Sequence, residues 1–120
     1  MKLIFTTSGE NVDSPLDPSF GRARNFLLYD LQTDAIEIIS NQQNLNAAQG
    51  AGIQAAQTIA KAGAKALITG HCGPKAFRVL EAAAIKVFNT DAATVAEALA
   101  RYRAGELTEA KSANVEGHWA

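Results

Sequence analysis

A buried strand that runs into a helix through a short glycine turn most constrains the fold of this chain. The apolar run at residues 66–69 is typical of a strand that is buried on both faces. Gly70 and Gly73 bracket the turn, and Pro74 stands where the first turn of a helix tolerates a missing N–H. Because a helix returns the chain to the start of the next strand, this unit predicts parallel strand pairing.

The turn itself holds the most reactive side chains of the chain. Cys72 is the single cysteine, and His71 beside it is one of two histidines. Loops at the carboxyl ends of strands bind ligands in open α/β sheets, and a thiolate beside an imidazole suits a metal or a metal–sulfur anion. We therefore take Gly70, His71, Cys72 and Gly73 as candidate binding residues, with His71 and Cys72 as candidate metal ligands. In the alternative, Cys72 is a small core residue in a purely structural turn, because cysteine is often buried. One cysteine and one histidine supply at most two ligands, so they cannot form a closed zinc site.

The front half of the chain is predicted to be antiparallel. Residues 2–7 form an apolar run that we expect to be the central strand. The runs 25–31 and 35–41 flank the polar turn at 32–34, which is the pattern of a β-hairpin, and we expect its first strand to pair antiparallel with the central one. Residues 8–24 form a long loop, and loops of that length in a compact domain are usually functional or mobile.

The back half is predicted to alternate helices and strands. Helices are expected from residue 50 or 51 to residue 62 and at 74–83, strands at 65–69 and 85–88, and a last helix ends at Gly105. The element order is βββαβαβα, an antiparallel trio joined to two parallel strands with helices on the sheet faces. The residues expected to face the core are, helix by helix, Ile53, Ala56, Ile59 and Ala60, then Phe77, Leu80 and Ala84, and then Val95, Leu99 and Tyr102. The side chains expected to cap the last helix are those of Asn89, Thr90 and Asp91.

Two helix starts and the long loop are expected to open on the same edge of the sheet. Small residues at the first helix start let a ligand approach backbone N–H groups at the positive end of the helix dipole. Two arginines in the loop can bind an anion, and the alternative is that they are ordinary solvated charges. The candidate cofactor-binding residues outside the turn are Ser19, Phe20, Arg22 and Arg24 in the loop and Gly50, Ala51 and Gly52 at the helix start.

Composition bounds the class of protein. A length of 120 residues predicts one domain, which we place at residues 1–105, followed by a partly mobile tail at 106–120 that contains His118 and Trp119. The formal net charge of −1 gives no reason to expect nucleic acid. The single cysteine fits a reducing compartment, and the apolar start at residues 3–5 is too short for a signal peptide or a membrane span. We therefore expect a cytoplasmic protein.

Several motifs of enzymes are missing from the sequence. No phosphate-binding loop, dinucleotide fingerprint or nucleophile elbow is present. A Cys–His catalytic pair requires the imidazole to face the sulfur, and adjacent residues of one turn rarely do so. We therefore predict no catalytic residue. The alternatives are a small thiol-dependent enzyme that uses Cys72, or a regulatory or scaffold module with a vestigial cleft.

Five segments in order together resemble the dinitrogenase iron–molybdenum cofactor-binding family, which includes NifX-type carriers and the C-terminal part of NifB-type proteins. These segments are residues 17–23, 50–56, 68–77, 84–88 and 94–99. The resemblance implies a ribonuclease H-like three-layer α/β fold with a mixed five-stranded sheet in the order 3-2-1-4-5. It also implies a role in binding or carrying a metal–sulfur cluster, with a cluster-assembly or acceptor protein as a partner.

One position departs from the family pattern. The residue before Phe20 and Gly21 is commonly a histidine in nitrogenase-associated relatives, and here it is Ser19. The resemblance therefore leaves His71 and Cys72 as the candidate donors. The implied cargo is an iron–molybdenum cofactor-like cluster or another molybdenum–sulfur cluster.

Overall fold

The computed structural model of the chain describes residues 1–42 and 51–111. The strands are β1 (Lys2–Thr7), β2 (Asn25–Asp30), β3 (Ile36–Ser40), β4 (Ala66–Thr69) and β5 (Lys86–Asn89), and the helices are α2 (Ala51–Lys61), α3 (Pro74–Ala82) and α4 (Val95–Arg103). The predicted strands and the first two predicted helices agree with these bounds to within one residue at each end.

The five strands form one mixed sheet in the order β3-β2-β1-β4-β5. β1 pairs antiparallel with β2 and parallel with β4, while β2 pairs antiparallel with β3 and β4 pairs parallel with β5. The central place of β1, the antiparallel hairpin and the two parallel strands are therefore confirmed. The implied strand order is confirmed as well, and the finer ribonuclease H-like classification stays a prediction.

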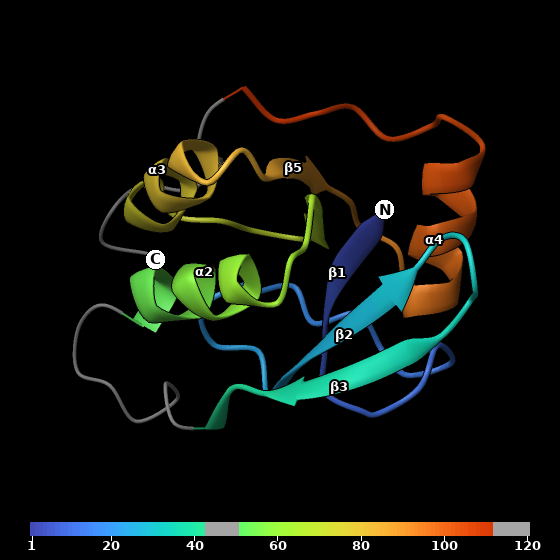
Figure 1. The fold of residues 1–120 in the computed structure, drawn as a ribbon. Helices are drawn as coiled ribbons and strands as arrows, with labels where there is room; N and C mark the ends of the chain where they lie inside the picture. The colour runs from blue at the N-terminus through green and yellow to red at the C-terminus, as the bar shows by residue number, and fades with distance from the viewer. Residues whose placement is uncertain (43–50, 112–120) are drawn as a thin grey trace.

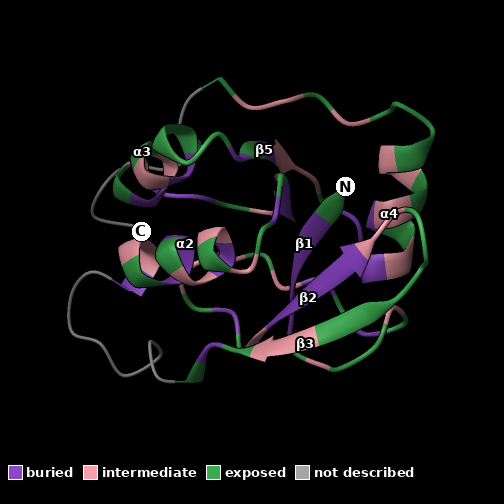
Figure 2. Cartoon of the chain, viewed as in Figure 1, coloured by how far each residue is buried: buried purple, intermediate pink, exposed green. Residues whose placement is uncertain are grey.

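Helices cover both faces of the sheet, with α2 and α3 on one face and α4 on the other (Figure 1). Successive side chains of a strand point to opposite faces, so β1 contributes to two separate cores. Ile4 packs with Ile59 of α2 and Leu80 of α3, whereas Leu3 packs in the core that contains Val95 of α4. Figure 2 shows β1 buried along nearly its whole length, which is the reason for its continuous apolar sequence.

The helix faces agree with the prediction except at the end of α3. Ala56, Ile59, Leu80 and Val95 are buried, and the other apolar residues predicted within the helices are half-buried. Ala84, which was predicted to face inward, is exposed.

Ala84 instead takes the position that ends α3. Its φ is +61°, and the next N–H, that of Ile85, donates to the carbonyl of Leu80 at 2.9 Å. This is a left-handed helix end of the kind that usually holds glycine. Gly63 (φ +85°) and Gly105 (φ +73°) occupy the corresponding places after α2 and α4, as predicted.

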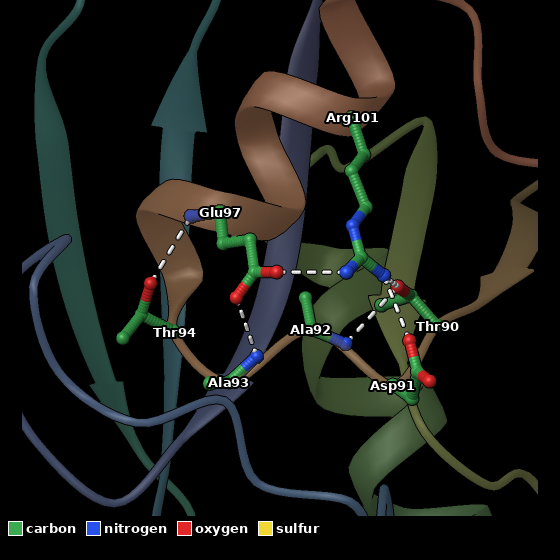
Figure 3. A network of polar contacts seen from close by, with 7 residues as sticks. All are labelled: Thr90, Asp91, Ala92, Ala93, Thr94, Glu97 and Arg101. Carbon is green, nitrogen blue, oxygen red and sulfur yellow. Dashed lines mark hydrogen bonds and ion pairs between the residues drawn. The ribbon is translucent and has the colours of Figure 1, made fainter.

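The cap of α4 also differs from the prediction. Thr94, and none of residues 89–91, is the N-cap: its Oγ1 accepts a hydrogen bond from the Glu97 N–H at 3.1 Å. The Glu97 carboxylate accepts in return from the Ala93 N–H at 2.9 Å (Figure 3). These bonds satisfy backbone donors that the first turn of a helix leaves without partners.

The chain beyond α4 returns to the sheet. Glu109 forms an antiparallel bridge with Phe88, and the Ala110 N–H donates to the carbonyl of Val87 at 2.7 Å. The outer edge of β5 is thereby partly covered. His118 and Trp119 lie outside the described residues, and the division into a domain at 1–105 and a tail stays a prediction. Within residues 1–42 and 51–111, no helix is long and apolar enough to cross a bilayer.

Candidate functional site

Two of the predicted site segments lie side by side at the carboxyl end of β4. Ser19 and His71 form a parallel bridge, in which the Phe20 N–H donates to the His71 carbonyl at 3.1 Å and the His71 N–H donates to the Pro18 carbonyl at 2.6 Å. A Cβ on Gly70 would lie 2.7 Å from that Pro18 oxygen. The approach of the long loop to β4 therefore requires glycine at position 70.

The start of α2 forms the third side of the same region. A Cβ on Gly21 would lie 3.1 Å from the backbone nitrogen and Cα of Gly52. A Cβ on Gly52 would in turn lie 3.1 Å from the Cβ of Ala76 in α3. The small residues thus let the loop and two helices meet at the carboxyl edge, where helix N-termini attract anions. Gly50 lies outside the described residues.

His71 and Cys72 have opposite surroundings. His71 is exposed, whereas Cys72 is only 2 % exposed and belongs to the core between the sheet and the helices α2 and α3. Its thiol donates a weak hydrogen bond to the Gly73 carbonyl, 3.7 Å from Sγ. Burial raises the pKa of the Cys72 thiol to about 12, so the thiol is protonated at neutral pH. The structure therefore favours the alternative in which Cys72 is a core residue.

The predicted site residues of the long loop also differ in their exposure to solvent. Phe20 is buried and packs against Phe26, with ring centroids 5.6 Å apart, so it anchors the loop to the core. Ser19 is half-buried, and Arg22 and Arg24 are exposed. The loop therefore presents its two guanidinium groups outward while its aromatic side chain is held inside.

Two buried hydroxyl groups that were not among the predicted site residues hold this loop. Thr6 and Thr69 are fully buried at the ends of β1 and β4, with their Oγ1 atoms 2.9 Å apart. Thr6 Oγ1 donates to the carbonyl of Asp17 at 2.6 Å, and the Asp17 carboxylate accepts from the Ser19 N–H at 3.0 Å. A threonine at the carboxyl end of each of two neighbouring buried strands was the available signal.

An open cavity of about 540 Å³ adjoins the bridge between Ser19 and His71. Cavities of this size accommodate small molecules. The cavity is lined by Leu16, Pro18, Gly70, His71, Asn89, Thr90, Asp91, Ala92 and Ala93. His71 is the one predicted donor in its wall. Residues 89–91 were predicted only as a helix cap. Asn89 ends β5, and Thr90 and Asp91 follow it, so all three lie at the edge of the sheet where ligands bind.

Thr90 and Asp91, which line the cavity, belong to an ion-pair network centred on Arg101 (Figure 3). The Arg101 guanidinium donates to Asp91 at 2.8 Å, to Glu97 at 2.7 Å and to Thr90 Oγ1 at 3.1 Å. The hydrogen bond from Arg101 lowers the pKa of the Asp91 carboxyl. Because two carboxylates balance Arg101, this arginine supports the β5–α4 loop and leaves anion binding to other groups.

Protein ligands alone do not form a metal centre in the described part of the chain. No group of three or more His, Cys, Asp or Glu side chains lies close enough together in residues 1–42 and 51–111 to hold a metal ion. The region instead combines helix N-termini with an exposed imidazole, and Arg22 and Arg24 are exposed on the same long loop, outside the lining of the cavity. Such a combination suits a preformed anion better than a bare metal cation.

The fold and this edge define a small α/β domain with a candidate anion-binding site where the long loop meets two helix starts. Comparison with known families agrees with that class. The sequence model of the dinitrogenase iron–molybdenum cofactor family matches residues 1–105, and the chain belongs to this family.

Individual relatives support the assignment. The apo form of the orange protein from Desulfovibrio gigas has a TM-score of 0.93 and 41% sequence identity, and the match covers 95% of this chain and 96% of that one. A candidate NifB protein from Thermotoga, solved by NMR, has a TM-score of 0.80 and 30% identity, with 90% and 91% covered. The uncharacterized protein MJ0580 of Methanocaldococcus jannaschii is 32% identical over 95 residues, which is 77% of this chain and 80% of that protein.

Proposed function

We propose that this protein binds and carries a small anionic metal–sulfur cluster, of the iron–molybdenum cofactor type or another molybdenum–sulfur type, for an assembly or acceptor protein. One observation carries the proposal: the long loop, the start of α2 and the turn of His71 meet at the carboxyl edge beside a cavity of about 540 Å³. The family name and the existence of an apo form of the orange protein support it.

The proposed contacts to the cluster follow from exposure and charge. His71 is exposed in the cavity wall, and its imidazole suits iron or copper. Arg22 and Arg24 offset the negative charge of the cargo, while backbone N–H groups near Ala51 and Gly52 donate to its sulfides. The backbone frame of the proposed site consists of Ser19, Phe20, Gly70 and Gly73. Gly50 lies outside the described residues and stays a predicted binding residue.

Cys72 is left out of the proposed donor set. Metal ligation requires an accessible thiolate, and this thiol is buried and protonated at neutral pH. The same two properties disfavour the alternative of a thiol-dependent enzyme. A scaffold module with an unused cleft is the remaining alternative, and the binding experiment distinguishes it.

Anaerobic purification followed by measurement of bound Mo, Fe, Cu and sulfide tests for cargo. Tetrathiomolybdate is a small metal–sulfur anion, and its absorbance reports binding to protein without cargo. We expect binding that weakens on the order of tenfold in His71→Ala and in Arg22→Ala, since each removes one charge-assisted or ligating contact. The salt dependence of binding decreases in Arg22→Ala, because screening acts on the charge that was removed.

Lys86→Ala is the matched control for Arg22→Ala. Lys86 is an exposed cation that begins β5 at the opposite end of the sheet, so its removal leaves binding unchanged. A protein that holds no metal and takes up no tetrathiomolybdate contradicts the proposed function and favours the scaffold alternative. Equal binding by the unmodified protein, His71→Ala and Arg22→Ala contradicts the proposed site.

A further inference from the structure

Asn41, just after β3, is a polar side chain buried completely in the protein, with 0% of its surface exposed. Its Nδ2 donates to the Ala23 carbonyl at 2.7 Å and to the Gly21 carbonyl at 3.4 Å. Its backbone N–H donates to the carbonyl of Arg24 at 2.9 Å. One residue therefore binds three carbonyl groups of a single four-residue segment, residues 21–24.

The segment 21–24 is the part of the long loop that leads into β2. It carries Arg22, and the backbone of its first residue, Gly21, lies against Gly52 at the start of α2. Phe20 anchors the segment at one end, and Asn25 joins β2 at the other. The hydrogen bonds of Asn41 hold the carbonyls between these two points.

Burial of a primary amide is unfavourable unless its donors have partners, which makes this arrangement specific. Asparagine supplies two N–H donors on a short stem, and both face carbonyl oxygens. Leucine at this position leaves both carbonyls without that donor, and aspartate places an oxygen against oxygens. Either change removes the two side-chain hydrogen bonds to Gly21 and Ala23 and leaves only the backbone hydrogen bond to Arg24.

We propose that Asn41 is a positioning residue of the cluster site: it holds residues 21–24 against the start of α2 and so determines where Arg22 meets an anionic ligand. This inference rests on the proposed function. It assigns to Asn41 no contact with the cargo itself, since the side chain is fully buried.

Limited digestion with trypsin tests the connection without any cargo. Trypsin cleaves after Arg22 and Arg24, which are both exposed. In Asn41→Leu and Asn41→Asp we expect cleavage at these two sites to accelerate on the order of tenfold, because local opening of the segment becomes easier. Cleavage elsewhere in the chain stays unchanged. Asn41→Ser is a milder variant, for use where the other two do not fold.

Ile85→Val is the matched control, because it trims a buried side chain near the amino end of β5 and leaves the loop contacts intact. Its global stability decreases modestly, without selective cleavage at Arg22 and Arg24. Equal acceleration at all tryptic sites in the Asn41 variants contradicts the inference, since it shows a global loss of stability only.

A double-mutant cycle with Arg22→Ala tests the positioning role on tetrathiomolybdate binding. If Asn41 places Arg22, removal of Arg22 weakens binding in the unmodified protein but has little further effect in Asn41→Leu or Asn41→Ser. Additive losses contradict the inference and leave the proposed function intact. If the unmodified protein binds no tetrathiomolybdate, the proposed function is contradicted, and the positioning role of Asn41 is contradicted as well because it rests on that function.

Discussion

The rate at which Cys72 reacts with an alkylating reagent distinguishes a thiol buried in the core from a thiol that is accessible for ligand binding or catalysis. Burial raises its pKa from 9.0 to about 12, which lowers the thiolate fraction near neutral pH about a thousandfold. Only the thiolate attacks an alkylating reagent, and the side chain is 2 % exposed. We therefore expect iodoacetamide at pH 7.5 to modify the folded protein at least about a thousandfold more slowly than the urea-unfolded chain.

Mass spectrometry of intact protein over time gives both alkylation rates. A folded-state rate within about tenfold of the unfolded rate would refute the reasoning, because it requires an accessible thiol of ordinary pKa. Cys72→Ala provides the second check. Its tetrathiomolybdate binding is expected to equal that of the unmodified protein, and a steep loss would restore Cys72 as a ligand.

The same pKa shift predicts how stability depends on pH. Between pH 9 and about pH 12 the unfolded chain loses the Cys72 proton while the folded protein keeps it. The contribution of Cys72 to stability is therefore fully present below pH 9 and is lost as the pH rises toward 12, by at most about 1.4 kcal/mol per pH unit. Urea unfolding at several pH values, compared between the unmodified protein and Cys72→Ala, isolates this contribution, and parallel pH profiles would contradict it.

Two further predictions concern helix ends, and both use urea unfolding. Ala84 has a left-handed backbone conformation at the end of α3, and Ala84→Gly relieves its steric strain. Glycine loses more backbone entropy on folding than alanine, and after that cost is subtracted we expect the free energy of unfolding to increase by about 0.5–1 kcal/mol. A decrease would show that Ala84 is unstrained. Thr94→Ala removes the N-cap of α4 and is expected to lower stability by about 1 kcal/mol, whereas Thr94→Ser retains most of it, and equal losses in both variants would contradict a capping role.

Much of the fold could be predicted because its signals are local. The apolar runs at 2–7 and 66–69 and the polar turn at 32–34 each specify an element from neighbouring residues alone. Gly63 and Gly105 mark helix ends for the same reason, since their conformation depends on the backbone at one position. The resemblance added the strand order, which local patterns leave open.

The tertiary structure alone decided which side chains of the candidate site face solvent. His71 and Cys72 are adjacent in the sequence, yet the pairing of this turn with Ser19 directs one outward and packs the other in the core. Thr94 rather than residues 89–91 caps α4, and here the sequence did carry a local signal, since Thr94 and Glu97 have the spacing of a capping box. Asn41 resembles any polar residue at a strand end, and its partners lie about twenty residues away. Hydrophobic patterning reports burial along one element, whereas these assignments depend on contacts between segments that only the folded chain brings together.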